Sequence, residues 1–194
     1  MVEIHIRHAE ASGEFGWGLT PTGIEQAKLA GDYVRKYFPA DFQLALHSGS
    51  RRAVQTAEEL GFPDLVWVKD ERLREADWLG RPEPQDFLQW KEMSGRVANV
   101  CEELDTRFPT QNRLIVSHGG TMRMVRVYRE RLGEDKFSTL FQSPYKYFTN
   151  CQLIIYTDED PATGNITPDS LWVKSVCPWD ESGRFGHDWI VVQL

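Results

Sequence analysis

Two kinds of hydrophobic pattern alternate along this chain. Short apolar runs predict β-strands, whereas apolar residues that recur every three to four positions predict amphipathic helices. The runs predict strands over residues 2–6, 44–48, 65–68, 113–117, 151–157 and 171–176, and a last edge strand in the tail 178–194. The recurrences predict helices over residues 20–38, 50–60, 97–108 and 121–132.

The order of these elements indicates the fold class. Strands that alternate with helices are typical of a largely parallel sheet with helices on both faces. We therefore expect an α/β fold with three layers, α/β/α, around a mostly parallel central sheet. The 194 residues suit one domain, and no repeat or linker divides them, so residues 1–194 are expected to form a single domain. Segment 69–84 is expected to be a loop, and segment 133–149 has no clear pattern.

Composition and charge exclude several classes of protein. With 41% hydrophobic and 26% charged residues, the chain reads as soluble and globular. A net charge of −7 argues against a nucleic-acid partner or an anionic membrane surface. No apolar run approaches the roughly 18 residues of a membrane span. Charges at Glu3 and Arg7 interrupt any signal-peptide core, so a cytoplasmic protein is expected.

The cysteines support the same compartment. Cys101, Cys151 and Cys177 are an odd number at wide spacing, with no CxxC pair. This spacing favours neither a disulfide framework nor a zinc site, and reduced thiols are typical of cytoplasmic proteins.

Three polar clusters come directly after predicted strands. Arg7-His8 follow the first strand, His47-Ser48 end the second, and residues 118–120 follow the fourth. In open parallel sheets, ligands bind beyond the carboxyl ends of the strands. We therefore expect these clusters to meet at one edge of the sheet and to form a site there.

Each of these polar residues alone has an ordinary structural explanation, but their combination indicates phosphate chemistry. Arginine forks match phosphate oxygens and stay charged. Glycines at a helix N-terminus let backbone N–H groups approach an anion. An imidazole that neighbouring arginines keep neutral can attack phosphorus, and a carboxylic acid can protonate the departing oxygen.

Five motifs resemble, in order, those of the histidine phosphatase superfamily, which includes the phosphoglycerate mutases. They are "RHAE" at 7–10, "LTPTGIEQA" at 19–27, "SGSRRAVQTAEEL" at 48–60, "LRE" at 73–75 and "VSHGGTMR" at 116–123. Any one motif is weak, whereas five in the family's order are specific. The resemblance implies a phosphoglycerate mutase-like fold. Beyond these motifs, only "FTNCQLIIY" resembles the strand that follows in the family.

The resemblance also implies a role for each matched residue. His8 would be the nucleophile that becomes phosphohistidine, and Arg7 and Arg52 would hold the phosphoryl oxygens. Arg52 is assigned rather than Arg51 because the family's arginine directly precedes the run that here spans 53–57.

Three further residues complete the implied site. His118 would donate to the phosphoryl group in the transition state. Glu75 would protonate the leaving group and then deprotonate the attacking water. Gly119 would let the backbone approach the anion. The chain departs from the family at Ala9, where glycine is usual, and at Ala11, where a hydroxyl residue is usual. The usual asparagine of the first loop has no evident counterpart. These departures bear on substrate affinity more than on the core reaction.

The leading functional hypothesis is a metal-independent phosphomonoesterase, without cofactor, that acts on a small phosphorylated metabolite through a phosphohistidine. A protein phosphohistidine phosphatase is the runner-up, but such proteins tend to be shorter and to lack the acid at the position of Glu75. A mutase is disfavoured because "READWLGRPEP" lacks the mutase pattern after the acid. A silent phosphate-binding module would not need every catalytic residue. A metallohydrolase is disfavoured because the arginines would repel a metal cation, and because the sequence lacks metal-ligand spacing such as HExxH. The oligomeric state and the substrate are not predicted.

Other polar and aromatic residues have weaker indications. His5 and His187 are expected to be structural or surface residues. For His47, a supporting role at the site and an ordinary structural role are equally indicated. Glu10 is a candidate substrate contact only. The tryptophans at 17, 78, 90 and 179 are expected to pack, with a pocket mouth as the alternative. Specificity is expected to come from loops 14–19, 77–90 and 133–150.

Overall fold

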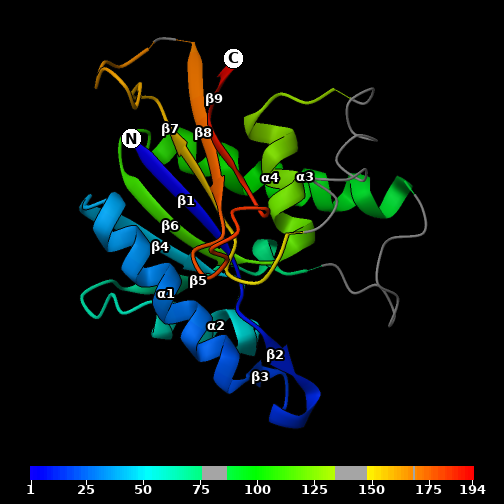
Figure 1. The fold of residues 1–194 in the computed structure, drawn as a ribbon. Helices are drawn as coiled ribbons and strands as arrows, with labels where there is room; N and C mark the ends of the chain where they lie inside the picture. The colour runs from blue at the N-terminus through cyan, green and yellow to red at the C-terminus, as the bar shows by residue number, and fades with distance from the viewer. Residues whose placement is uncertain (76–86, 134–147, 168) are drawn as a thin grey trace.

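The computed structural model describes residues 1–75, 87–133, 148–167 and 169–194. In these ranges, a seven-stranded sheet has the strand order β5-β4-β6-β1-β7-β8-β9 (Figure 1). Four neighbouring strands run parallel: β5 (Trp67–Lys69), β4 (Phe42–His47), β6 (Asn112–Ser117) and β1 (Val2–Arg7). Three antiparallel strands extend the sheet: β7 (Leu153–Thr157), β8 (Ser170–Val176) and β9 (His187–Gln193).

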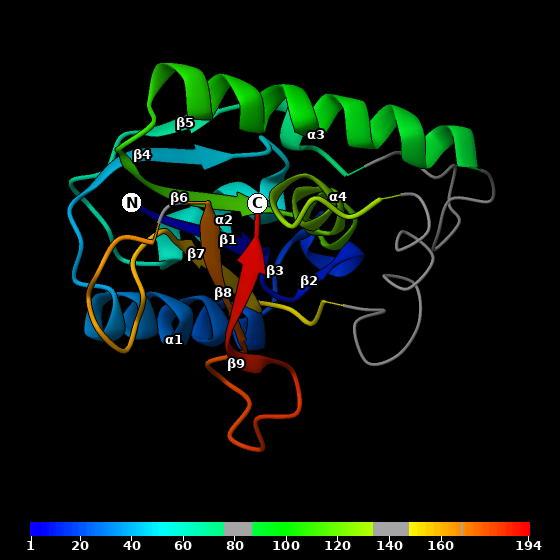
Figure 2. The same cartoon turned by 90° about the horizontal axis from the view of Figure 1, so that it is seen from above.

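Helices cover both faces of this sheet. On one face lie α1 (Pro21–Tyr37) and α2 (Arg51–Glu59), and on the other lie α3 (Phe87–Arg107) and α4 (Gly119–Arg129). Figure 2 shows α1 and α3 on opposite sides of the strands. Alternation along the strands explains this, because Ile155 of β7 packs with α1 and α2 whereas its neighbour Ile154 packs with α3 and α4. The predicted three-layer α/β/α fold is confirmed.

The start of α1 holds the loop that follows β1. Thr20 Oγ1 accepts a hydrogen bond from the N–H of Gly23 at 3.0 Å, and Pro21 occupies the first turn, as the sequence predicts. A Cβ at Gly23 would lie 2.1 Å from the carbonyl oxygen of Glu10. Glycine therefore lets α1 lie directly against the chain that follows His8.

The third helix is longer than predicted. It begins at Phe87 rather than at Val97. Trp90 and Met93 extend the apolar face that continues through Val97 and Cys101, and all four side chains are buried in one cluster. The sequence prediction assigned residues 77–90 to a loop, and the part at 77–86 lies outside the described residues.

Short elements were also missed. The glycine-rich stretch after β1 forms a hairpin of β2 (Ala11–Ser12) and β3 (Gly18–Leu19), and Leu19 N donates to Gln55 Oε1 of α2 at 2.8 Å. The predicted strand 65–68 begins only at Trp67, and Val66 is 81% exposed. The predicted loop after Lys69 includes a 3₁₀ turn, η2 (Glu71–Leu73).

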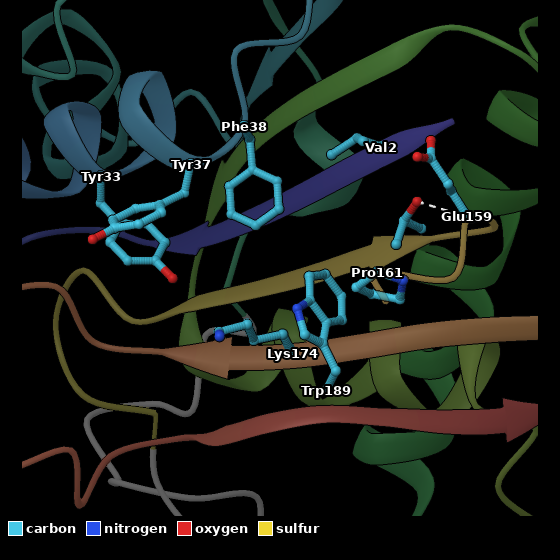
Figure 3. A pocket seen from close by; sticks show the side chains of 9 residues that line it. Val2, Tyr33, Tyr37, Phe38, Glu159, Pro161, Lys174 and Trp189 are labelled. Carbon is cyan, nitrogen blue, oxygen red and sulfur yellow. Dashed lines mark hydrogen bonds between the residues drawn. The ribbon is translucent and has the colours of Figure 1, made fainter. Parts of the chain in front are cut away.

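A cavity of about 340 Å³ lies on the α1 face at the start of β1 (Figure 3). Phe38 and Trp189, both labelled in Figure 3, line it with their rings edge to face, at a centroid distance of 6.2 Å and an interplanar angle of 67°. Val2 lines this cavity and begins β1, whereas Arg7 ends the strand. The cavity is therefore at the opposite end of β1 from the sequence-predicted site. In the described ranges, no helix is long and apolar enough to cross a membrane.

Candidate active site

The carboxyl ends of three parallel strands meet at the sequence-predicted site. Arg7 of β1 is in register with Ser117 of β6, and His8 N donates to the carbonyl oxygen of Ser117 at 2.9 Å. Ser48, which follows β4, donates its N–H to the carbonyl oxygen of Val116 at 3.2 Å. The polar residues that follow these strands are therefore brought together, as the strand-end argument predicts.

The His8 imidazole is held in one tautomer. Its Nδ1 lies 2.8 Å from the carbonyl oxygen of Ala9, and its Nε2 lies 3.0 Å from Nε of Arg52. A carbonyl only accepts and a guanidinium only donates, so Nδ1 carries the proton and Nε2 carries the lone pair. The lone pair therefore points toward the cationic group.

The environment of His8 keeps the ring neutral. Burial lowers the pKa of His8 to about 3, and the positive charges of Arg7 and Arg52 act in the same direction. The hydrogen bond to Ala9 opposes this shift only in part. At neutral pH the ring is therefore an uncharged base, the form in which an imidazole is nucleophilic.

A second buried imidazole faces the first. The ring centroids of His8 and His118 are 5.1 Å apart, and His118 is 1% exposed. Nη2 of Arg52 lies 3.1 Å from Nδ1 of His118, so one guanidinium contacts both rings. Burial lowers the pKa of His118 well below its usual value, and the neighbouring His8, Arg52, Arg7 and Arg74 lower it further.

Arg7 is the second cation of the site, and like Arg52 it is partly buried. Its Nη1 donates to the carbonyl oxygen of Phe148, and its Nε is buried without a hydrogen-bond partner among the described residues. Burial lowers the pKa of Arg7 and of Arg52, and attraction to Glu75 opposes that fall. An arginine remains charged at any working pH, so the site carries two cations beside two neutral imidazoles.

Glu75 reaches the site after the η2 turn. Its Oε2 accepts a hydrogen bond from the N–H of Gly120 in the first turn of α4 at 3.1 Å. A Cβ at Gly120 would lie 2.4 Å from Oε1 of Glu75, so this close approach depends on glycine. The carboxylate thus lies at the positive end of the α4 dipole. Gly119 lies beside Arg7, where an added Cβ would have ordinary contacts at 3.9 Å.

Several supporting residues were not singled out from the sequence. Thr56 Oγ1 accepts from Ala9 N at 3.0 Å and donates to the carbonyl oxygen of Arg52 at 2.6 Å, which ties the His8 loop to α2. Asn150 Nδ2 donates to the carbonyl oxygen of His8 at 3.1 Å. Thr56 and Asn150 lie inside the quoted motifs "AVQTA" and "FTNC", which was the available signal.

The remaining candidate residues lie in other contacts. His5 is buried and bonded to Glu3 at 2.7 Å, as expected of a structural histidine. His47 accepts from Gly49 N at 3.0 Å, and His187 Nδ1 lies 2.9 Å from the carbonyl oxygen of Asp188. Glu10 accepts from Thr20 Oγ1 at 2.7 Å.

The tryptophans divide between packing and exposure. Trp90 is buried beneath the guanidinium of Arg123, which lies 5.8 Å from its ring centroid, and Trp179 donates to the carbonyl oxygen of Asn150 at 2.6 Å. Trp17 is 63% exposed at the tip of the β2–β3 hairpin. Trp78 lies outside the described residues. Among those described, no group of three or more His, Cys, Asp or Glu side chains is arranged to hold a metal ion.

The fold and the site together define an α/β protein whose buried imidazoles and partly buried guanidiniums can bind an anion. The family model of the histidine phosphatase superfamily (branch 1) matches residues 5–87 and 76–157. The chain therefore belongs to the histidine phosphatase superfamily.

Similar proteins carry phosphatase names. The "Putative phosphoserine phosphatase 2" of Hydrogenobacter thermophilus (strain DSM 6534 / IAM 12695 / TK-6) is 29% identical over 156 residues, which are 62% of this chain and 74% of that protein. A solved mycobacterial glucosyl-3-phosphoglycerate phosphatase has a TM-score of 0.61 and 21% identity, and the match covers 80% of this chain and 92% of that one. A solved phosphoserine phosphatase from Entamoeba histolytica has a TM-score of 0.61 and 18% identity, and the match covers 81% of this chain and 90% of that one. At these identities the two solved structures show the fold alone.

Proposed function

We propose that this protein is a metal-independent phosphomonoesterase that hydrolyses a small phosphorylated metabolite through a phosphohistidine at His8. The observation that carries the proposal is the His8 tautomer, in which the Nε2 lone pair faces the Arg52 guanidinium. A phosphoryl group bound to that guanidinium would lie directly before the lone pair. The buried Arg7 Nε, which lacks a partner among the described residues, supports a second phosphate contact.

In the first step, His8 Nε2 forms a bond to phosphorus as the bond from phosphorus to the ester oxygen breaks. Glu75, as the carboxylic acid, gives its proton to the departing oxygen. Arg7 and Arg52 exchange their present contacts for phosphoryl oxygens and balance the charge of the transition state. His118 stands on the other side of Arg52 and donates to the same group.

In the second step, water attacks phosphorus and the bond to His8 Nε2 breaks. The Glu75 carboxylate accepts a proton from the water, so the acid is regenerated for the next cycle. The net reaction converts a phosphate ester and water into an alcohol and inorganic phosphate, and no metal or cofactor takes part.

The substrate class follows from the similar proteins and from the site. The names of two similar phosphatases specify phosphoserine and glucosyl-3-phosphoglycerate, which are small anionic metabolites. Two partly buried guanidiniums, those of Arg7 and Arg52, suit such phosphate monoesters. We further propose that residues 1–194 act as one domain in the cytoplasm, which the three free cysteines support.

The test is hydrolysis of p-nitrophenyl phosphate in EDTA between pH 5 and 8. We expect the wild-type enzyme to stay active in the chelator and His8→Ala to lose activity by about 10³-fold or more. His187→Ala is the matched control and should retain activity, because His187 lies on the edge strand β9. Acid-labile phosphate on His8 in quenched reactions would support the intermediate. Full activity of His8→Ala would overturn the proposal.

A further inference from the structure

Two serine hydroxyls contact the outer nitrogen of His118. Ser48 Oγ lies 2.8 Å from Nε2 of His118, and Ser50 Oγ lies 3.3 Å from the same atom. The two hydroxyl oxygens are 3.1 Å apart, so each can also bond to the other. Ser48 is fully buried, which makes its hydroxyl a fixed part of the site.

The turn between β4 and α2 places both hydroxyls. Gly49 has a φ of +77°, and a Cβ there would lie 2.6 Å from Cε of Lys69. This left-handed turn allows serines on both sides of the glycine to face His118. Ser50 occupies the N-cap position of α2, yet its side chain makes no cap hydrogen bond. A serine at that position usually caps the helix, so its hydroxyl is directed elsewhere.

These contacts determine which nitrogen of His118 carries the proton. Nη2 of Arg52 can only donate, so Nδ1 of His118 must accept and is unprotonated. Nε2 therefore carries the hydrogen and donates it to Ser48 Oγ, whose own proton is free to go to Ser50 Oγ. The nitrogen that faces the phosphate site, Nδ1, therefore carries a lone pair and no hydrogen in the ligand-free protein.

We propose that Ser48, supported by Ser50, is a positioning residue that holds His118 as the Nε2–H tautomer and keeps accepting the hydrogen bond from this N–H when the ring takes up its second proton at Nδ1. In this arrangement, His118 donates to a phosphoryl oxygen only as an imidazolium. The catalytic consequence rests on the proposed function, whereas the tautomer does not.

The charges around His118 explain why such support is needed. His8 and Arg7 from β1 and its end, Arg52 from α2, and Arg74 beside η2 all lower the pKa of His118, and burial lowers it most. The carboxylate of Glu75 also lies nearby and accepts a hydrogen bond from the N–H of Gly120. A bound phosphate brings negative charge into this cationic site and favours the imidazolium. A neutral hydroxyl acceptor at Nε2 stabilises the charged ring further.

The first experiment reads the tautomer directly by NMR of ligand-free protein labelled with ¹⁵N-histidine. A His118→Asn variant assigns the His118 signals. We expect wild type and Ser48→Thr to show a protonated Nε2 and an unprotonated Nδ1 at pH 7. Ser48→Ala removes the nearer acceptor of the Nε2–H and leaves only the Arg52 contact and the longer Ser50 contact to favour this tautomer, so it should show mixed or exchanging nitrogen signals. A wild-type spectrum with the proton on Nδ1, or no change in Ser48→Ala, would overturn the proposal.

The second experiment follows kcat for p-nitrophenyl phosphate against pH. Ser48→Ala should lose about 10- to 100-fold in kcat, as expected when a hydrogen bond to a charged group is removed. Its basic limb should move to lower pH, because the imidazolium loses an acceptor that favours it. Ser48→Thr should restore both values, and melting curves check that each variant is folded.

The two experiments separate the two proposals. A wild-type protein that hydrolyses no phosphate ester but shows the Nε2–H tautomer would overturn the proposed function and support the positioning by Ser48. An active wild type whose Ser48→Ala variant keeps its tautomer and its pH profile would do the reverse.

Discussion

At the residue scale, Arg52 is the central group of the site. It donates from Nε to His8 at 3.0 Å and from Nη2 to His118 at 3.1 Å. Only a guanidinium presents two such donors in a fixed plane, and a lysine ammonium replaces it as a single point charge. Arg51 is its immediate neighbour, yet Arg51 is exposed and makes neither contact.

The adjacent arginines give a matched pair of substitutions. Arg52→Lys should lower kcat/KM for p-nitrophenyl phosphate by about 10²- to 10³-fold, because one donor to the developing charge is lost. Arg51→Lys should change it by less than about twofold, as most exposed substitutions do. Steady-state kinetics at constant ionic strength measures both. Equal losses in the two variants would contradict the assignment of Arg52.

The two depressed histidine pKa values also predict how stability depends on pH. An unfolded histidine takes up a proton below its ordinary value of 6.5, whereas folded His8 does so only near a pKa of about 3. The unfolded state therefore binds more protons between these values, so stability falls as the pH drops through that window. His118 acts in the same direction. Each group adds at most about 1.4 kcal/mol per pH unit.

Urea unfolding between pH 4.5 and 7 measures this dependence. His8→Gln should flatten the decline in the free energy of unfolding, because the variant has no proton to take up at this position. His187→Gln is the control and should keep the wild-type slope, because His187 lies on the edge strand β9 and outside the site. Identical slopes in wild type and His8→Gln would show that burial of the His8 ring does not govern acid stability.

At the scale of elements, the N-terminus of α4 determines where the acid lies. Glu75 accepts from Gly120 N at 3.1 Å, and Thr121 Oγ1 donates to the carbonyl oxygen of Leu73 at 3.1 Å, so the helix holds both ends of this short segment. Gly120 leaves the space that the carboxylate occupies. The helix thereby fixes the distance between the acid and the two imidazoles.

Gly120→Ala should displace Glu75, because the new Cβ would lie 2.4 Å from Oε1 and 3.2 Å from Cε of Met93. We expect a loss of about 10²-fold for alkyl phosphates and a much smaller loss for p-nitrophenyl phosphate, whose leaving group needs little protonation. Glu75→Gln should show the same selective loss. Gly95→Ala in α3 is the control, since nothing lies within 4 Å of its Cβ. It should keep activity and gain about 0.5–1 kcal/mol in stability. Equal losses for both substrates would argue against displacement of an acid.

The sequence predicted long elements and strand ends better than short elements and side-chain contacts. The strand that starts at Val2 and the helix that starts at Pro21 were found because periodicity and punctuation agree there. The hairpin at Ala11–Ser12 was missed because two-residue strands have no periodicity. The predicted site residues meet because parallel strands end at one edge, where the segments that follow them also lie. The contacts of Thr56 depend on distances between elements, which no local pattern contains.

At the scale of the whole molecule, a buried ionic cluster joins the sheet to the helices of one face. Glu3 of β1 accepts from Arg113 of β6 at 2.7 Å and from Arg129 of α4 at 2.7 Å. Asp105 of α3 accepts from the same two arginines at 3.1 and 2.6 Å. Nearby cations hold the pKa of Glu3 well below its usual range, although burial alone would raise it. The cluster therefore connects four elements, β1, β6, α3 and α4, through ion pairs.

Glu3→Gln should destabilise the protein by about 3–5 kcal/mol, because it removes the buried carboxylate that Arg113 and Arg129 share and leaves them only the partly exposed carboxylate of Asp105. The cluster lies near the start of β1 whereas His8 follows its end, so kcat of the folded enzyme should not change. Glu25→Gln removes the exposed partner of Lys28 and should cost less than about 1 kcal/mol. Urea unfolding measures both variants, and p-nitrophenyl phosphate turnover below the unfolding transition measures activity. A cost for Glu3→Gln as small as that for Glu25→Gln would mean that the arginines find other acceptors, and the cluster would then contribute specificity of packing rather than stability.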